Sequence, residues 1–299
     1  MEILKKITKG RIKKPFFMLL AGPPGIGKTT FAAGSENALI IGPEEGSYNL
    51  DVSRAPKANS LNDILNVIDE LRSQDHEFKT LVIDSLSATE PLVWEAVCKV
   101  DGSKSIEQAQ GGFGKGYTMA NKMWQNLISS LHSLRDEKNM NIIVIAHSMI
   151  KPFNDPMLAQ PYDRYVISLN EKASALWSRE VDVIGFANYE IFLKIGQTEK
   201  KNKALSENNR ILYLNRRPEF EAKNRLGLPD EMPLLFSEFE NHLKNAYSIG
   251  SVESITLEIQ DLLQEVKDQD LKDKITASII GANQQKLMQI KNRIKEILK

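Results

Sequence analysis

Short runs of consecutive apolar residues recur through the first half of the chain and predict buried β-strands. These runs are unbroken rather than alternating, as is typical of strands buried on both faces of a parallel sheet. Between them lie segments with apolar residues three and four positions apart, which predict amphipathic helices. The predicted strands are residues 16–20, 38–41, 80–83 and 142–146, and the predicted helices are residues 28–33, 61–72 and 119–135. This alternation predicts right-handed βαβ units and a doubly wound α/β domain.

The pattern changes in the second half of the chain. Further strands are predicted at 181–187, 190–195 and 210–214, and we expect them to extend the same sheet with antiparallel edge strands. After residue 250 only helical spacing remains, with one apolar seam from Ile255 to Val266 and another from Leu287 to Ile297. Neither seam is sustained over several heptads, which favours a helical hairpin packed on its own core over an oligomerising coiled coil. We therefore divide the chain into a basic N-terminal arm (1–15), an α/β domain (16–248) and a helical region (249–299).

Composition narrows the class of protein. The 299 residues are 41% hydrophobic and 26% charged, which excludes wholesale disorder. Lys and Arg number 39 and balance 39 Asp and Glu, so an anionic partner must be met by a local patch. Cys98 is the only cysteine, which excludes a disulfide framework and a cysteine zinc cluster. The apolar run at 16–21 is too short to be a signal or a span, so we expect a cytoplasmic protein without a membrane partner.

A phosphate-binding motif follows the first predicted strand. Residues 22–29, GPPGIGKT, satisfy G-x-x-x-x-G-K-[ST] in full, between a buried strand and a helix. In such a loop the backbone amides cradle phosphates, Lys28 reaches the β/γ oxygens and the Thr29 hydroxyl is a ligand of Mg²⁺. The predicted nucleotide-binding residues are Gly22, Pro23, Pro24, Gly25, Ile26, Gly27, Lys28, Thr29 and Thr30. The sequence therefore predicts a site for ATP with Mg²⁺.

Acidic residues that suit ATP hydrolysis follow two other predicted strands. Asp84 ends the strand LVI, where ligands bind in open α/β sheets, and with Ser85 it forms the predicted metal-side pair. An acid that orients or deprotonates the attacking water is also needed. Because Ser85 rather than a glutamate follows Asp84, we look to the end of the second strand, where Glu44 is the preferred base and Glu45 the alternative.

At this point the chain resembles RecA-like P-loop ATPases, and in particular bacteriophage nucleotide-binding proteins grouped with single-strand-annealing recombinases. The resemblance covers residues 15–230, and a glutamate after the second strand with none after Asp84 argues against AAA+ loaders. The segments that carry it are AGPPGIGKTTFA, IIGPEEGSYNLDVSR, LVIDSLSATEPLVW, GGFGKGY, NIIVIAHS and EAKNRLGLP. It implies a mostly parallel twisted sheet with helices on both faces, antiparallel edge strands and a C-terminal helical appendage.

The resemblance also implies residue roles. Glu44 would be the water-activating glutamate, and Asp84 the magnesium aspartate. His147 stands where relatives place a polar γ-phosphate sensor, usually Gln, and it has a structural interpretation as well. Relatives form rings or filaments in which a neighbour's cation enters the ATP site, and Lys223 and Arg225 match that place; the alternative is a basic surface loop. We therefore expect a homo-oligomer with ATP at the subunit interfaces.

Single-stranded DNA is the partner that the resemblance implies. RecA relatives bind it through two mobile loops, which correspond here to residues 100–116 and 148–172. The candidate DNA-binding residues in and beside them are Lys104, Phe113, Lys115, Tyr117, Lys151 and Arg164. Cations and aromatic rings on flexible backbone suit phosphate neutralisation and base stacking. Contact of these loops with protein is the alternative.

A basic stretch from Lys194 to Arg225, together with the N-terminal arm, would supply local positive charge. The favoured function is an Mg²⁺-dependent, DNA-stimulated ATPase that promotes annealing or strand exchange in phage-type recombination, in the cytoplasm of a bacterial host, with a single-strand-binding protein as a candidate partner. Two rivals stay open. One is a helicase loader or protein-remodelling ATPase, and the other is an ATP-gated adaptor that does not hydrolyse ATP.

Overall fold

The computed structural model describes residues 7, 12–190, 192–194, 203–205, 209–248 and 252–298. The chain divides into two compact units, Met1–Phe239 and Glu240–Lys299. The first is an α/β unit on one large sheet, and the second is helical. The basic arm predicted at 1–15 lies almost entirely outside the described residues. Within the described ranges, no helix is both long and apolar enough to cross a membrane.

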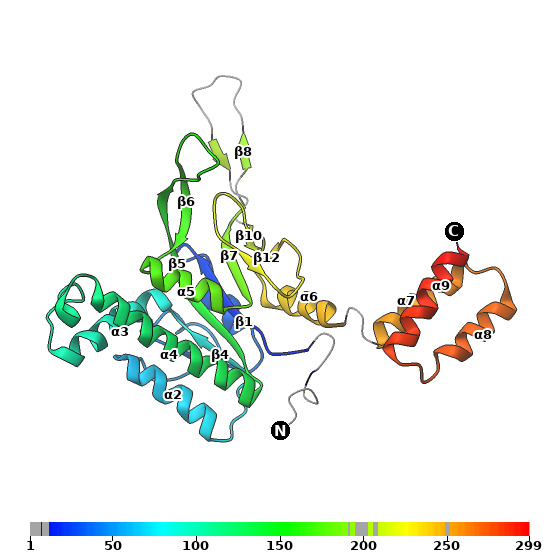
Figure 1. Cartoon of the computed structure of the whole chain (residues 1–299), viewed down its shortest axis with the longest axis horizontal. Coiled ribbons are helices and arrows are strands. Elements are labelled where there is room, and N and C mark those ends of the chain that lie inside the picture. Colours follow the sequence, from blue (N-terminus) through cyan, green and yellow to red (C-terminus); the bar gives the residue numbers. More distant parts are fainter. Residues whose placement is uncertain are drawn as a thin grey trace. The chain divides into compact units, whose positions relative to one another are not determined.

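The large sheet has a parallel core with antiparallel strands at one edge (Figure 1). Its main path runs in the order β12-β10-β7-β1-β5-β4-β2-β3. The strands from β7 to β3 pair in parallel, whereas β10 and β12 are antiparallel. Their bounds are β1 Phe17–Gly22, β2 Ala38–Ile41, β3 Ser53–Arg54, β4 Thr80–Ile83, β5 Asn141–Phe153, β7 Val183–Tyr189, β10 Arg210–Tyr213 and β12 Glu231–Pro233. This is the predicted RecA-like arrangement, and β1, which carries the phosphate motif, lies near the centre.

Helices cover both faces because alternate residues of the buried strands point to opposite sides. Leu19 and Val144 belong to the core on one side, where four helices pack against the sheet (Figure 1). These helices are α2 Leu61–Ser73, α3 Leu86–Asp101, α4 Lys115–Lys138 and α5 Glu171–Glu180. On the other face, α1 (Lys28–Ala33) and the first turn of α6 (Phe236–Ser248) meet through the rings of Phe31 and Phe236, whose centroids are 5.4 Å apart.

Three expectations about the strands need correction. First, β5 does not end at residue 146 but continues to Phe153 and turns back as β6, Tyr162–Ile167, so a β-hairpin occupies much of the loop predicted at 148–172. Second, β7 pairs in parallel with β1 and is a core strand rather than an antiparallel edge strand. Third, β8 (Phe192–Lys194) pairs with β9 (Lys203–Leu205) in a separate two-stranded sheet. A short antiparallel strand, β11 (Lys223–Asn224), also pairs with β7.

The helical unit contains α7 Val252–Glu265, α8 Gln269–Ile279 and α9 Gln284–Ile297, so the predicted hairpin has a third helix between its arms. The two predicted seams pack against each other, because Ile255 and Ile259 of α7 share one buried cluster with Leu287 and Ile294 of α9. The unit therefore has a core of its own. The functional division at residue 248 stays a prediction.

Gly42, directly after β2, lets two loops of the sheet approach each other. Its φ is +148°, and a Cβ at this position would lie 2.1 Å from the carbonyl oxygen of Asp84. The Glu44 amide then donates to that same carbonyl oxygen at 3.3 Å. A side chain at position 42 would therefore push the segment that carries Glu44 away from the end of β4.

Replacing Gly42 with Ala is expected to lower the free energy of unfolding by about 2–3 kcal/mol, because a methyl group meets fixed backbone at a φ that L-residues disfavour. Urea denaturation followed by tryptophan fluorescence measures the change, since Trp94, Trp124 and Trp177 all lie in the α/β unit. Gly46→Ala is the matched control, because nothing lies within 4 Å of its Cβ position. Equal stability of the two variants would contradict the packing described here.

Candidate functional site

The phosphate loop lies between β1 and α1. Every residue of β1 is buried, which holds the start of the loop in the centre of the sheet. Gly27 begins α1 with φ +107°, a conformation that the absence of a side chain permits. The turn aligns Lys28 and Thr29 on the first turn of the helix, beside the ends of the parallel strands. The local fold therefore matches the strand–loop–helix context that the motif requires.

Lys28 is buried inside this loop. Its Nζ donates to the carbonyl oxygens of Gly22 at 2.9 Å and Pro23 at 2.8 Å. Burial lowers the pKa of Lys28, while the nearby Asp84 and Glu44 oppose this shift. Among the described residues, the hydrogen-bond partners of the ammonium are therefore these two neutral carbonyl groups.

Asp84 and Thr29 meet across the sheet. The Thr29 hydroxyl donates to Asp84 Oδ2 at 2.7 Å, although the residues belong to α1 and to the end of β4. Asp84 is 3% exposed, and burial raises the pKa of its carboxyl group, with the Thr29 hydrogen bond opposing this. A buried carboxylate beside a threonine hydroxyl is a donor set that suits Mg²⁺, which takes oxygen ligands and is completed by phosphates and water. These two residues could hold the metal.

Glu44 lies in the same cluster. Its Oε1 accepts hydrogen bonds from the Ser85 hydroxyl at 2.5 Å and from His147 Nε2 at 3.0 Å. The bond from His147 is the largest cause of a lowered pKa of Glu44, and the bond from Ser85 adds to it. Glu44 is therefore held as a carboxylate near Asp84. Its other oxygen, Oε2, receives no hydrogen bond from the part of the chain that the structure describes.

The alternative base, Glu45, points elsewhere. Its carboxylate lies 3.7 Å from Lys57 Nζ, and about half of its side chain is exposed. Of the two candidates, the structure brings only Glu44 into the cluster with Asp84 and Lys28.

His147 and Ser85 have defined partners. The His147 amide donates to the Ser87 hydroxyl at 3.0 Å, which anchors the end of the parallel part of β5. Because an ionised carboxylate only accepts, His147 Nε2 carries the proton in its bond to Glu44. Ser85 caps α3 by accepting a hydrogen bond from the Ala88 amide at 3.2 Å, and its hydroxyl donates to Glu44 rather than to Asp84, with which we expected it to form a metal-side pair. The Asp84–Ser85 peptide bond is cis.

Arg210 is a residue that the sequence pattern did not single out. It begins β10, and its Nη1 donates to the Ile26 carbonyl oxygen of the phosphate loop at 3.4 Å. A Cβ on Gly27 would lie 2.7 Å from the same Nη1. Among described residues, Arg210 has no acidic partner within ion-pair distance. The only signal in the sequence was its membership of the basic stretch 194–225, much of which lies outside the described residues.

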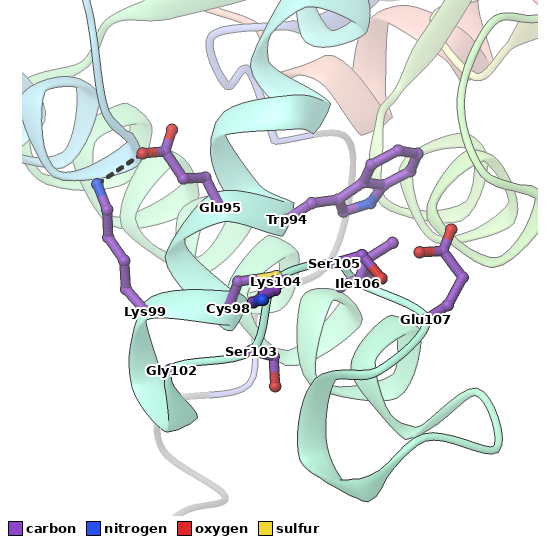
Figure 2. Close-up of a pocket in the computed structure, with 10 residues that line it drawn as sticks. All are labelled: Trp94, Glu95, Cys98, Lys99, Gly102, Ser103, Lys104, Ser105, Ile106 and Glu107. Carbon is purple, nitrogen blue, oxygen red and sulfur yellow. Dashed lines mark ion pairs between the residues drawn. The ribbon is translucent and has the colours of Figure 1, made fainter.

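The first predicted DNA segment has two distinct parts. Its early part borders a pocket of about 540 Å³ between α3 and the segment before α4. Figure 2 shows the residues that line it, among them Trp94, Glu107 and the ion pair between Glu95 and Lys99. No residue of the phosphate loop lines it.

The later part of this segment displays Phe113, whose side chain is fully exposed. All five residues from Gln110 to Gly114 have positive φ, including the non-glycine residues Gln110 (58°) and Phe113 (53°). Lys115 begins α4 directly afterwards. Tyr117 is engaged, because its hydroxyl donates to Glu107 at 3.0 Å and its ring meets Trp94 edge-on. Phe113 and Lys115 are thus displayed, whereas Tyr117 supports the loop.

The predicted trans-acting cations lie away from this chain's own phosphate loop. Lys223 Nζ donates to the carbonyl oxygens of Ser178, Arg179 and Val181 and thereby caps the C-terminal end of α5. Burial lowers the pKa of Lys223. Arg225 makes one long contact with the Arg179 carbonyl oxygen at 3.5 Å. Arg225 is therefore the freer of the two cations.

Comparison with known proteins places this architecture in a family. A family model described as an AAA domain matches residues 14–226. The solved structure of the RadB recombinase matches with 16% sequence identity and a TM-score of 0.39, over 70% of this chain and 86% of that chain. No curated protein matches the chain. The strand order and the phosphate loop after β1 agree with a RecA-like P-loop core.

Replacing His147 with Ala is expected to raise the pKa of Glu44, because the largest cause of its lowering is lost. In the wild type, stability linked to Glu44 is present above its ordinary pKa of 4.5 and is lost as the pH falls through the lowered value. Compared with the wild type, His147→Ala is therefore expected to lose most stability at pH values above 4.5, where the contribution of Glu44 is fully present. Carboxyl ¹³C NMR titration of Glu44 measures the shift, and an unchanged pKa would show that His147 does not hold the carboxylate.

Proposed function

Because this chain belongs to the AAA domain family and has a RecA-like P-loop ATPase core, we propose that it is an Mg²⁺-dependent ATPase that binds single-stranded DNA and promotes its annealing or strand exchange. The observation that carries the proposal is the contact of Thr29 with buried Asp84, beside a glutamate held as a carboxylate. These contacts support the proposal because they bring the phosphate loop, Thr29, Asp84 and Glu44 together in one place.

The residues of this cluster have separate roles in the proposed hydrolysis. Lys28, now bonded to loop carbonyls, turns to the phosphate oxygens when ATP binds. Thr29 and Asp84 would hold Mg²⁺, which would supply positive charge next to the phosphates when it is bound. Glu44 orients the attacking water and accepts its proton at the unoccupied Oε2. Ser85 and His147 fix Oε1, so that the carboxylate keeps its orientation.

We also propose that the ATPase works as a ring or filament with ATP at the subunit interfaces. This is supported by the absence of Lys223 and Arg225 from the cluster around their own phosphate loop. Arg225 is the better candidate for entry into a neighbour's site, because Lys223 already caps α5. A cation added there would stabilise charge that develops in the transition state.

Single-stranded DNA is proposed as the partner from the displayed residues of the first segment and from the β5–β6 hairpin. An exposed aromatic ring next to a lysine suits base stacking and phosphate contact. Phe113 is held out by backbone of positive φ, which non-glycine residues adopt at an energetic cost, so its exposure is built into the loop. A role in phage-type recombination, with a single-strand-binding protein as a further partner, belongs to the same proposal.

Steady-state ATP hydrolysis tests the proposal directly. Wild-type turnover is expected to rise with single-stranded DNA and faster than linearly with protein concentration. Glu44→Gln should lower kcat by about 10²–10⁴ while ATP still binds, and Lys28→Ala should abolish turnover. Glu45→Gln is the matched control and should keep wild-type turnover. Turnover indifferent to DNA would contradict the DNA part and favour a protein-remodelling ATPase, and tight ATP binding without turnover would indicate an adaptor.

Arg210→Ala is expected to weaken ATP binding about tenfold, because a charge-assisted contact at the phosphate loop is lost. Arg179→Ala removes the same charge from an exposed position on α5 and should leave the Kd unchanged. Calorimetric titration of both variants with ATP provides the comparison. Equal Kd values would exclude a contribution of Arg210 to the site.

A further inference from the structure

The β5–β6 hairpin brings two cations together. Lys151 and Arg164 are directly opposite each other in the antiparallel register. Like charges in this position repel, and a sheet normally offsets them with an acidic neighbour. Within the described ranges, no ion pair joins either residue to a carboxylate. Asp155 and Asp163 make the formal net charge of the hairpin zero, but neither forms an ion pair with these two cations, so the positive charge is local to the pair.

Arg164 is the unusual member of the pair because it is 7% exposed. Its guanidinium makes no hydrogen bond with any described residue, and its Nε is a buried donor without a partner. The charged group stacks on the ring of Phe153, whose centroid lies 4.9 Å from Cζ. Buried guanidinium groups are almost always paired with an acid or hydrogen-bonded. A buried, unpartnered arginine indicates that an acceptor from outside the chain completes it.

A cavity lies next to this arginine. It has a volume of about 280 Å³ and is enclosed by the hairpin, α5 and the segment at Glu221. Ser178 of α5 lines it with a hydroxyl that is buried and has no hydrogen-bond partner. Glu171 and Glu221 also line the cavity but form no ion pair with Lys151 or Arg164. Because their negative charge repels an anion, an anion binds here only if a strong set of donors holds it. Two residues that line this cavity, one on a strand and one on a helix, thus each carry a buried polar atom without a partner.

We propose that this cavity is an oxyanion site that accepts a phosphate group. The guanidinium supplies N–H donors in a fork that matches phosphate oxygens, Lys151 adds a second charge, and the Ser178 hydroxyl supplies a donor from the opposite wall. The cavity is larger than one phosphate group, so more of the ligand enters with it. The phosphate comes from a DNA backbone or from a free phosphate compound. The first source rests on the proposed function, and the second does not.

The site predicts an effect of inorganic phosphate on stability. In the Lys28→Ala background, which weakens phosphate binding at the loop after β1, phosphate should raise Tm relative to chloride at equal ionic strength. Arg164→Gln should abolish that shift and Ser178→Ala should reduce it, whereas Arg179→Gln, an exposed arginine on the same helix, should retain it. In phosphate-free buffer Arg164→Gln should be at least as stable as its parent, because an unpaired buried charge is removed.

A second arm identifies the source of the phosphate. Affinity for a fluorescent oligo-dT is measured over a salt series for the wild type, Arg164→Gln and Arg179→Gln. Loss of about tenfold in affinity and of about one unit of salt slope, in Arg164→Gln only, assigns a backbone phosphate. A phosphate shift that depends on Arg164, without any change in oligonucleotide binding, assigns a free phosphate compound. This result supports the site even if the wild type binds no DNA.

The proposal is overturned if phosphate raises Tm equally in Arg164→Gln and its parent, or in neither, while oligonucleotide binding is also unchanged. If Arg164→Gln does not fold, Ser178→Ala replaces it as the test variant, because it keeps the buried charge. A full phosphate shift in Ser178→Ala, with unchanged oligonucleotide binding, would then be the contradicting result.

Discussion

The hydrogen bond between Thr29 and Asp84 is the contact on which the arrangement of the site depends. It joins the first turn after β1 to the end of β4, and β5 runs between those two strands. Parallel strands place their carboxyl ends at one edge of a sheet, so this single contact registers the phosphate loop against the acidic end of a neighbouring strand. Glu44, which follows β2 at the same edge, then reaches the carbonyl oxygen of Asp84.

The ionisable groups at this edge of the sheet differ in how their surroundings shift their pKa values. Asp84 and Lys28 are both buried, and this burial raises the pKa of Asp84 and lowers that of Lys28. In Glu44 the hydrogen bonds outweigh burial: two of them hold the carboxylate ionised and lower its pKa. A buried carboxylate and an ammonium hydrogen-bonded to carbonyl groups are suited to a ligand that carries both phosphate and a cation. Their displacement in opposite directions from ordinary pKa values is typical of functional sites.

Sequence patterns predicted the parts of the fold where one signal was dominant. Strands such as β2 and β4 are unbroken apolar runs, and the phosphate loop is a complete motif, so both were predicted at their observed positions. The β5–β6 hairpin was missed because Pro152 and polar residues interrupt its pattern. Which of Glu44 and Glu45 turns toward Asp84 depends on the path of the backbone after β2, and so on the φ of Gly42. The contact of Arg210 with Ile26 joins residues 184 positions apart. Local patterns carry neither a backbone angle nor a contact of that range.

Magnesium-dependent ATP binding measures whether Thr29 and Asp84 form one site for nucleotide and metal, as we propose. ATP is titrated calorimetrically into wild type and Asp84→Asn, with Mg²⁺ and with EDTA. We expect Mg²⁺ to tighten ATP binding by the wild type, and we expect Asp84→Asn to lose this gain while it keeps the affinity measured in EDTA. An equal gain from Mg²⁺ in both proteins would contradict it.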